Sequence, residues 1–271
     1  MQSIWINGIS QSQVDVRDRG FAYGDGLFET LKVRQGKALL FERHIARLRA
    51  GALRLGFPDA GVEALVRDIQ AIYLPDEAVM KLTLSRGTGG RGYAYDSSLS
   101  ATRVIMLAPL PAFADEYSQG VRVRFCDLRL GLNPALAGIK HLNRLEQVIA
   151  RNEWSDPSVS EGLVLDYEGF LAEGTMSNLF WCQGDRIFTP QLDRCGVEGI
   201  VRNLLIQRFS EQGYVVEQGR YRPALLQQAD EVFICNSLID VWPVRELDNT
   251  PFPLGPLARV AQQIIGQEYN A

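Results

Sequence analysis

The sequence is poor in the residues that most often build metal sites and disulfide frameworks. It has two histidines and four cysteines in 271 residues, and no two cysteines form a CxxC pair. We therefore expect neither a metal site nor a disulfide framework, and we interpret the cysteines as reduced, partly buried thiols.

Long apolar runs and a net positive charge are also missing. The best apolar stretch, VIMLAPLPAF (residues 104–113), is broken by prolines and is too short for the ~20 consecutive apolar residues of a membrane span. The first residues, MQSIWINGIS, lack the basic and apolar regions of a secretory signal. The net charge of −4 argues against nucleic acid or an anionic membrane as a partner. We expect a cytoplasmic protein without either partner.

Short predicted strands alternate with helices along the chain, which indicates an α+β protein in two parts, residues 1–112 and 118–271. Residues 41–55 have an apolar face at helical spacing, formed by Ile45, Leu48, Ala52 and Leu55. Two prolines and several small polar residues in 108–120 predict a linker. In the second part, helices are predicted from near Lys140, over 199–212 and over 257–267.

Lys140 follows an apolar run, a position where lysine is seldom fully buried. Its ammonium could simply extend to water along its apolar stem. Alternatively, partial desolvation could favour the neutral amine, which is nucleophilic. Such an amine could hold an aldehyde cofactor, pyridoxal phosphate, as a Schiff base. That interpretation requires an acid for the pyridine nitrogen, a cradle for the phosphate and an anchor for the substrate.

Two stretches offer the acid and the cradle. In LAEGTMSNLFW (residues 171–181), Glu173 ends an apolar strand and could pair with a pyridinium nitrogen. Further on, Gly196 and Gly199 precede a helix whose first turn holds Ile200 and Val201. The amide groups at such a helix start suit a phosphate. Taken alone, each stretch also fits an ordinary surface turn or a glycine-initiated helix.

Taken together, these residues resemble the signature of the class IV family of pyridoxal-phosphate-dependent aminotransferases. Lys140 stands 33 residues before Glu173, a separation like that between the family's Schiff-base lysine and its pyridine-binding glutamate. ERHIARL looks like the family's helix with the phosphate-binding arginine, here Arg47, and FAYGDGLFETLKV matches the family's early GDG strand. The signature is matched at Glu173, Asn178-Leu179-Phe180, Ile187, Thr189, Val197, Gly199-Ile200 and Arg202.

The resemblance implies a two-domain fold-type IV enzyme, with a small N-terminal α/β domain and a larger C-terminal pseudo-barrel domain that carries Lys140 and Glu173. It implies pyridoxal 5'-phosphate as cofactor, Lys140 as the catalytic residue and a homodimer. The cofactor contacts that it implies are Arg47, Lys140, Glu173, Ser177, Asn178, Ile200, Val201 and Ser237.

Branched-chain transamination, D-amino-acid transamination and aminodeoxychorismate lysis all occur in this family. LAGIKHLNRLEQV and SRGTGGRGY are similar to the lyase branch. D-amino-acid transaminases usually have tyrosine where this chain has Phe28; their carboxylate-binding arginine is retained as Arg91, whose histidine partner is replaced by Tyr93. The resemblance thus implies Phe28, Arg91 and Tyr93 as substrate contacts, with Arg86 as an alternative anchor.

The implied activity is conversion of 4-amino-4-deoxychorismate into 4-aminobenzoate and pyruvate, in folate synthesis. A transaminase, or a non-catalytic small-molecule binder on the same scaffold, is the alternative. The loop GTGGRG lacks the Gly-Lys-Ser/Thr ending of a nucleotide-binding loop, so we do not expect ATP binding.

Overall fold

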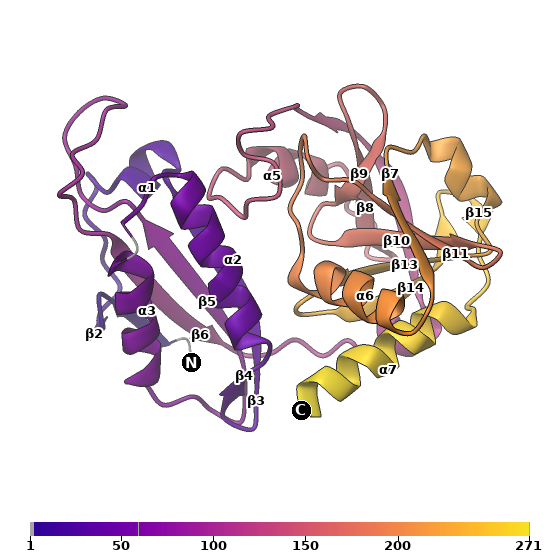
Figure 1. Ribbon diagram of the computed structural model, residues 1–271, viewed down its shortest axis with the longest axis horizontal. Coiled ribbons are helices and arrows are strands. Elements are labelled where there is room, and N and C mark those ends of the chain that lie inside the picture. Colours follow the sequence, from indigo (N-terminus) through magenta and orange to yellow (C-terminus); the bar gives the residue numbers. More distant parts are fainter. Residues whose placement is uncertain (1–2, 59, 271) are drawn as a thin grey trace. The chain divides into compact units, whose positions relative to one another are not determined.

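The computed structural model describes residues 3–58 and 60–270, and the chain divides into two units (Figure 1). The first comprises the chain up to Pro111 together with Ile139–Asn143, and the second comprises Ala112–Gly138 and the chain from Arg144 onward. Two parts were predicted, but the division differs from the predicted one. Part of the expected linker forms helix α4 (Ala114–Gln119) in the second unit, because Pro109 and Pro111 precede this helix and do not interrupt it.

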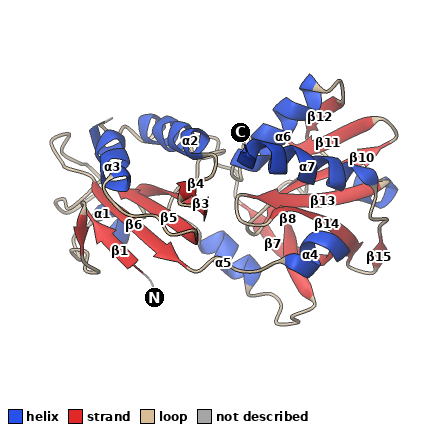
Figure 2. Cartoon of the chain, turned by 90° about the horizontal axis from the view of Figure 1, so that it is seen from below, coloured by secondary structure: helices blue, strands red, loops and turns tan. Residues whose placement is uncertain are grey.

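The first unit is an antiparallel sheet in the order β2-β1-β6-β5-β3-β4, with helices α2 and α3 on one face (Figure 2). Its strands are β1 (Ser3–Ile6), β2 (Ile9–Ser10), β3 (Gly26–Arg34), β4 (Lys37–Ala38), β5 (Glu77–Ser85) and β6 (Thr102–Ala108). Its helices are α1 (Arg19–Tyr23), α2 (Phe41–Arg54) and α3 (Ala60–Gln70).

Helix α2 confirms the helix predicted from apolar spacing. Ile45, Leu48 and Ala52 are buried in the core between the helices and the sheet. On β3 every second side chain, including Leu31 and Val33, points into the same core. The remaining core position on that face of β3 is Glu29, a buried carboxylate among apolar neighbours.

The segment Ile139–Asn143 adds to the sheet beside β3. The Phe28 amide donates to the carbonyl oxygen of Lys140 (3.0 Å), and the Leu142 amide donates to the carbonyl of Gly26 (2.9 Å). Lys140 is thus extended, and helix α5 (Leu145–Arg151) begins five residues later. Two predictions were wrong here: no helix begins near Lys140, and Lys140 belongs to the first unit. The reason is the open edge of β3, which offers hydrogen-bond partners to the passing chain.

The second unit is built on a nine-stranded mixed sheet, in the order β12-β11-β10-β13-β14-β7-β8-β9 with β15 beside β14. The sheet curls so that β9 also lies against β10, which gives the pseudo-barrel (Figure 1). The strands are β7 (Val121–Leu130), β8 (Val159–Asp166), β9 (Leu171–Gly174), β10 (Asn178–Gln183), β11 (Arg186–Pro190), β12 (Val215–Gly219), β13 (Glu231–Asn236), β14 (Asp240–Leu247) and β15 (Thr250–Pro251).

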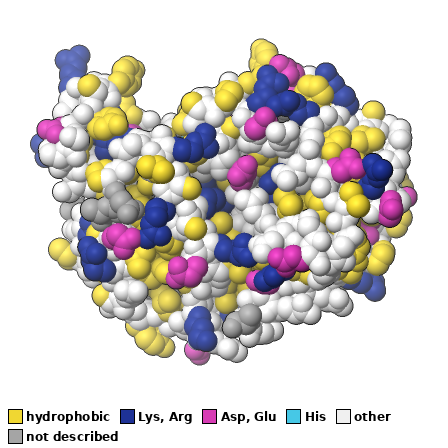
Figure 3. Space-filling view, viewed as in Figure 1, with side chains coloured by type: hydrophobic (Ala, Val, Ile, Leu, Met, Phe, Trp, Pro, Cys, Tyr) yellow, Lys and Arg dark blue, Asp and Glu magenta, His cyan; other side chains and the backbone are white. Residues whose placement is uncertain are grey.

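Helices α6 (Ile200–Glu211) and α7 (Pro256–Asn270) lie side by side against this sheet (Figures 1 and 2). A short 3-10 helix covers Pro223–Gln228. Acidic and basic side chains are interspersed on the face shown in Figure 3, in keeping with the near balance of 32 acidic and 28 basic residues. A search of the described residues for a helix that could span a membrane finds none.

Candidate active site

In the first unit, Lys140 lies beside Phe28, so two of the predicted site residues are brought together. Lys140 is half-buried, and its Nζ lies 4.4 Å from the centre of the Phe28 ring. An ammonium at this distance from an aromatic face is attracted by the ring. The hydrogen bond from the Phe28 amide to the Lys140 carbonyl fixes the main chain at the same point. Both the backbone and the amine of Lys140 are therefore positioned by β3.

The predicted phosphate-binding arginine, Arg47, is held by Glu29. The Nε of Arg47 donates to Oε1 of Glu29 (2.8 Å) and its Nη2 to Oε2 (2.5 Å). His44, one turn earlier on α2, contacts the same carboxylate through Nδ1 at 2.6 Å. This two-pronged contact fixes the plane of the Arg47 guanidinium while leaving about 13% of the side chain exposed.

The charges in this cluster follow from its burial. Burial alone would raise the pKa of the Glu29 carboxyl, but the charge of Arg47 and the hydrogen bonds from His44 and Arg47 bring it down to about 2. Burial lowers the pKa of His44, the hydrogen bond to Glu29 opposes this, and the charges of Arg47 and Lys140 lower it further. Near neutral pH the cluster therefore contains an ionised Glu29, a charged Arg47 and a neutral His44.

In the second unit, Glu173 is buried at the end of β9, and its carboxylate is oriented by main chain. The Val197 amide donates to Oε2 of Glu173 at 2.8 Å. Gly196, next to it, has φ +81°, and a Cβ there would lie 3.2 Å from the Glu173 carboxylate. A side chain at Gly196 would thus be strained and would crowd the acid.

Asn178, at the start of β10, holds the loop that leads into α6. Its Nδ2 donates to the Val197 carbonyl (2.9 Å), and its Oδ1 accepts from the Gly199 amide (3.1 Å). A Cβ at Gly199 would lie 2.0 Å from that Oδ1, so glycine is required there. Helix α6 then begins at Ile200 without a side-chain cap. The amides of its first turn, which include Ile200 and Val201, have no acceptor within the helix and suit an anion.

Ser177, predicted as a cofactor contact, is engaged inside its own turn. Its Oγ donates to Oε2 of Glu161 at 2.7 Å. Glu161 is fully buried and also accepts from the amide and hydroxyl of Thr175, from the Met176 amide and from the Gly162 amide. This carboxylate thus ties down the turn that joins Glu173 to β10.

Ser237 follows β13, and the pairing of Asn178 with Cys235 places the end of β13 beside the start of β10. The adjacent Asn236 donates to the Met176 carbonyl at 3.0 Å, which links the two turns. In the second unit the structure therefore brings together the predicted residues Glu173, Ser177, Asn178, Ile200, Val201 and the turn with Ser237. Their contacts with a cofactor remain predictions.

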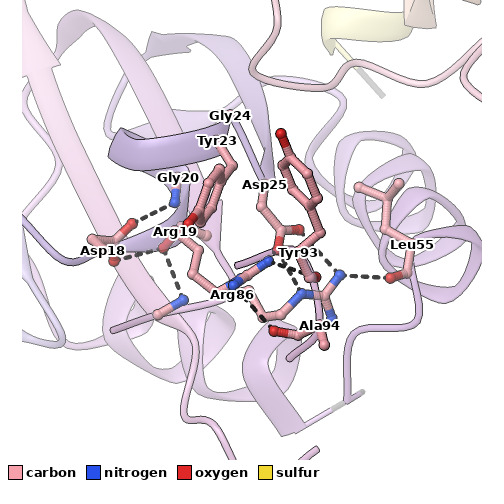
Figure 4. Close-up of polar contacts among 12 residues, drawn as sticks. Asp18, Arg19, Gly20, Tyr23, Gly24, Asp25, Leu55, Arg86, Tyr93 and Ala94 are labelled. Carbon is pink, nitrogen blue, oxygen red and sulfur yellow. Dashed lines mark hydrogen bonds and ion pairs between the residues drawn. The ribbon is translucent and has the colours of Figure 1, made fainter. Parts of the chain in front are cut away.

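The predicted substrate arginine, Arg91, lies in the loop between β5 and β6 of the first unit. Its side chain is exposed, and so is that of Tyr93, whose ring packs edge-on against Tyr23 at 5.7 Å. The alternative anchor, Arg86, is buried and donates to Asp25 (2.8 Å) and to the Leu55 carbonyl (2.7 Å), as Figure 4 shows.

The Arg86 guanidinium also lies 3.7 Å from the centre of the Tyr95 ring. These contacts occupy Arg86 within the protein. The structure therefore favours Arg91 over Arg86 as the residue available to a substrate.

Sequence reasoning missed the residues that support the predicted ones. Glu29 and Glu161 are single acids in otherwise apolar strands, and that isolation is the signal that could have identified them. His44 precedes Arg47 by one helical turn, a spacing that places both on one face. Arg144, just before α5, was also missed: burial lowers its pKa, while the charge of Glu173 raises it.

The described residues contain no group of three or more histidines, cysteines or acids arranged to hold a metal. All four cysteines are unpaired, as predicted. Burial raises the pKa of Cys126, Cys195 and Cys235 to about 12, so these thiols stay protonated and are poor nucleophiles.

A model of the family described as amino-transferase class IV matches residues 26–247. The chain belongs to the class IV aminotransferase family. The matched region runs from the start of β3 to the end of β14, and it contains every predicted cofactor-binding residue.

Several class IV relatives are similar over almost the whole chain. The aminodeoxychorismate lyase of Vibrio harveyi is 35% identical, over 95% of this chain and 97% of the relative. The D-alanine aminotransferase of Bacillus licheniformis is 27% identical, over 93% and 90%. The solved structure of 4-amino-4-deoxychorismate lyase from Pseudomonas aeruginosa superposes with a TM-score of 0.92 and 43% identity, over 99% of this chain and 100% of that one. The predicted α+β, two-domain class IV fold is thereby confirmed.

Proposed function

We propose that this class IV protein is an aminodeoxychorismate lyase, which converts 4-amino-4-deoxychorismate into 4-aminobenzoate and pyruvate. The observation that carries the proposal is the 43% identity, over 99% of the chain, to the lyase of Pseudomonas aeruginosa. The listed transaminase structures from Escherichia coli and Thermus are similar in fold at lower identity, 23–24%.

The residues of the two units fit pyridoxal phosphate as the cofactor. The first unit offers a half-buried amine, Lys140, and a fixed guanidinium, Arg47. The second offers an oriented carboxylate, Glu173, and the uncapped first turn of α6, with Ile200 and Val201. An amine for the aldehyde, an acid for the pyridine nitrogen and donors for the phosphate are the groups that this cofactor requires.

Bound pyridoxal phosphate would supply an electron sink for the carbon that bears the substrate amino group. We assign Lys140 to hold the cofactor covalently and, once displaced by the substrate amine, to take the proton from that carbon. Glu173 keeps the pyridine nitrogen protonated. The carbon–oxygen bond to the neighbouring ring carbon then breaks, enolpyruvate leaves and becomes pyruvate, and the ring becomes aromatic. No second amino acceptor is needed.

Phe28 supports the lyase over a D-amino-acid transaminase. The side chain at this position lies against Lys140 and is a plain phenyl ring, which has no hydroxyl to donate to a substrate carboxylate. In the proposed enzyme, carboxylate binding therefore falls to Arg91, whose guanidinium fork suits a carboxylate better than an ammonium does. Tyr93 is the proposed neighbour in that contact.

The proposal includes a homodimer and a cytoplasmic location. Helix α5 exposes Leu145, Val148 and Ile149, at positions i, i+3 and i+4, and so presents an apolar face that a second copy could cover. The unpaired thiols suit a compartment that keeps cysteines reduced. Light scattering of the purified protein tests the dimer, and Val148→Glu is expected to shift it toward monomer.

An absorption spectrum followed by a pyruvate assay tests the function. We expect purified protein with pyridoxal phosphate to show a band in the near-ultraviolet to visible range that Lys140→Ala lacks, and to release pyruvate from 4-amino-4-deoxychorismate. A colourless protein that binds the substrate unchanged would support the non-catalytic alternative. Release of pyruvate from D-alanine only when a 2-oxo acid is added, without activity on 4-amino-4-deoxychorismate, would support a transaminase.

A further inference from the structure

A buried arginine holds the main chain that follows Arg91. Arg19 on α1 is only 3% exposed, and its guanidinium donates to the carbonyl oxygens of Gly92 (2.9 Å) and Tyr93 (3.0 Å) (Figure 4). A longer contact of 3.5 Å reaches the carbonyl of Ala94. These three residues directly follow Arg91 in the sequence. One buried guanidinium thus fixes the direction in which the chain leaves Arg91.

Other contacts fix the guanidinium itself. Its Nε donates to Oδ2 of Asp25 (3.0 Å), which also accepts from Nε of Arg86 (2.8 Å), so Asp25 lies between two arginines (Figure 4). The Arg19 guanidinium carbon lies 4.8 Å from the centre of the Tyr23 ring. The Tyr23 hydroxyl in turn accepts from the Gly92 amide at 3.1 Å, which gives the loop a second tether.

The residues around Arg91 make these tethers decisive. Arg91 lies between Gly90 and Gly92, and a Cβ at either glycine would have no atom within 4 Å. Gly92 has φ +96°, which glycine adopts readily. The main chain at Arg91 is therefore not shaped by side-chain packing of its neighbours. The hydrogen bonds to Arg19 and Tyr23 determine where it runs.

We propose that Arg19 is a positioning residue that presets Arg91 for the substrate carboxylate. This inference rests on the proposed function, in which Arg91 is the anchor. Arg19 itself is buried, so it acts through the loop. A loop ordered before binding spares the substrate the entropy cost of ordering it. A lysine could carry the charge of Arg19, but it lacks the planar fork that serves one carboxylate and two carbonyls together.

Steady-state kinetics with 4-amino-4-deoxychorismate gives the first test. Arg19→Gln is expected to raise KM about 3- to 10-fold, the range that follows from the cost of ordering a side chain and its loop. Because the reacting groups are untouched, kcat should stay within about twofold. In an Arg91→Ala background, Arg19→Gln should cause no further rise. Arg19→Lys should recover part of the loss. Arg17→Gln is the matched control, since Arg17 is an exposed arginine two residues away that pairs with Asp15.

Limited digestion with trypsin gives a test that is independent of activity. Cleavage after Arg91 should be faster in Arg19→Gln than in the wild type, because the released loop fits the protease more easily. Arg17→Gln should be cleaved after Arg91 at the wild-type rate. Arg91→Ala should lose this fragment, which identifies the bond. Tyr23→Phe removes the second tether and keeps the ring, so it should raise both the cleavage rate and KM by a smaller factor.

The outcomes separate the possible errors. If Arg91→Ala leaves KM unchanged, both the anchor and this inference are overturned. If Arg91→Ala raises KM but Arg19→Gln has an equal effect with and without Arg91, the positioning role is overturned and the anchor stands. An unchanged trypsin pattern in Arg19→Gln would also overturn it. Should Arg19→Gln fail to fold, Tyr23→Phe decides, and wild-type KM and cleavage in that variant would refute the inference. Absence of pyruvate release by the wild type would overturn the proposed function and the inference with it.

Discussion

The amide of Val197 donates a hydrogen bond to the carboxylate of Glu173, at 2.8 Å and across 24 residues of sequence. The acid is thus oriented by the same loop that leads into α6. Because Asn178 bonds to both Val197 and Gly199, the loop is itself fixed from β10. A proposed pyridine partner and a proposed phosphate site are therefore parts of one rigid piece of main chain.

Glu173→Gln should lower lyase turnover on the order of 10²-fold or more, the scale of a positioned proton-transfer group. The amide oxygen can still accept from Val197, so the loop and cofactor retention should persist. Turnover and bound cofactor are measured by pyruvate release and by absorbance after dialysis. Glu168→Gln is the control, because Glu168 is an exposed acid nearby in sequence that pairs with Arg194. Unchanged turnover with cofactor bound would show that another acid serves the pyridine nitrogen.

Lys140→Ala should abolish turnover while the fold survives. The main-chain hydrogen bond from Phe28 to residue 140 does not depend on the side chain, and truncating a half-buried lysine leaves no large cavity. Thermal unfolding should therefore shift little, whereas pyruvate release should be lost. Lys81→Ala is the matched control, since the Lys81 amine lies 5.5 Å from the same Phe28 ring. Near-wild-type turnover in Lys140→Ala without added amine would refute the assignment.

Arg47→Ala should weaken cofactor retention, because the proposed guanidinium–phosphate contact is lost. Glu29→Gln should have a smaller effect in the same direction, since a neutral amide holds the plane of Arg47 less firmly. The half-time of cofactor loss on dialysis measures both. Arg49→Ala, on the same helix but in an exposed pair with Glu63, should retain cofactor like the wild type. Equal retention in Arg47→Ala would show that Arg47 has a purely structural role.

The buried His44 should make stability fall as the pH drops below about 6.5. Its folded-state pKa is lowered, chiefly by burial, so the native ring stays neutral while the unfolded chain takes up a proton. The unfolded state then binds more protons, and the free energy of unfolding falls by up to about 1.4 kcal/mol per pH unit for one group.

Urea unfolding at pH 7.5 and 5.5 measures this slope. His44→Gln keeps a donor for Glu29 and should have a shallower slope, with the other titrating groups common to both proteins. Identical slopes would show that His44 does not titrate differently in the folded state.

Glu161→Leu should destabilise the second unit by about 3–5 kcal/mol, because buried donors such as those of Thr175 and Ser177 would lose their acceptor. Denaturant unfolding measures the loss. Glu161→Gln should cost less, since an amide oxygen still accepts. Glu217→Leu, at an exposed pair with Arg186, is the control and should change stability by less than about 1 kcal/mol. A wild-type unfolding midpoint in Glu161→Leu would mean that the turn does not depend on this carboxylate.

Local signals in the sequence were enough for some of these features. Helix α2 follows from the spacing of Ile45, Leu48 and Ala52, and the start of α6 follows from Gly199, because both depend on neighbours within a few turns. The loop carrying Arg91 follows from its glycines. The signature that includes Glu173 and Arg202 indicated the family, whose model matches the chain.

Long-range pairing could not be predicted in the same way. The extended conformation of Lys140 depends on main-chain partners at Gly26 and Phe28, more than a hundred residues away. An amphipathic pattern near Lys140 predicted a helix, and the open edge of β3 outweighed it. The grip of Glu29 on Arg47 was likewise invisible, since a lone acid in a strand does not indicate its partner.

The excursion of Ile139–Asn143 into the first unit has a consequence for biosynthesis. A ribosome that has completed residues 1–111 has not yet made the strand that pairs with Gly26–Phe28, and it must first synthesise residues 112–138 of the second unit. The first unit therefore cannot finish folding in N-to-C order, and a gene cut after Pro111 would yield a fragment with an uncovered sheet edge prone to association. Supplying residues 139–143 through a short designed linker after Pro111 would restore that edge in a single contiguous piece.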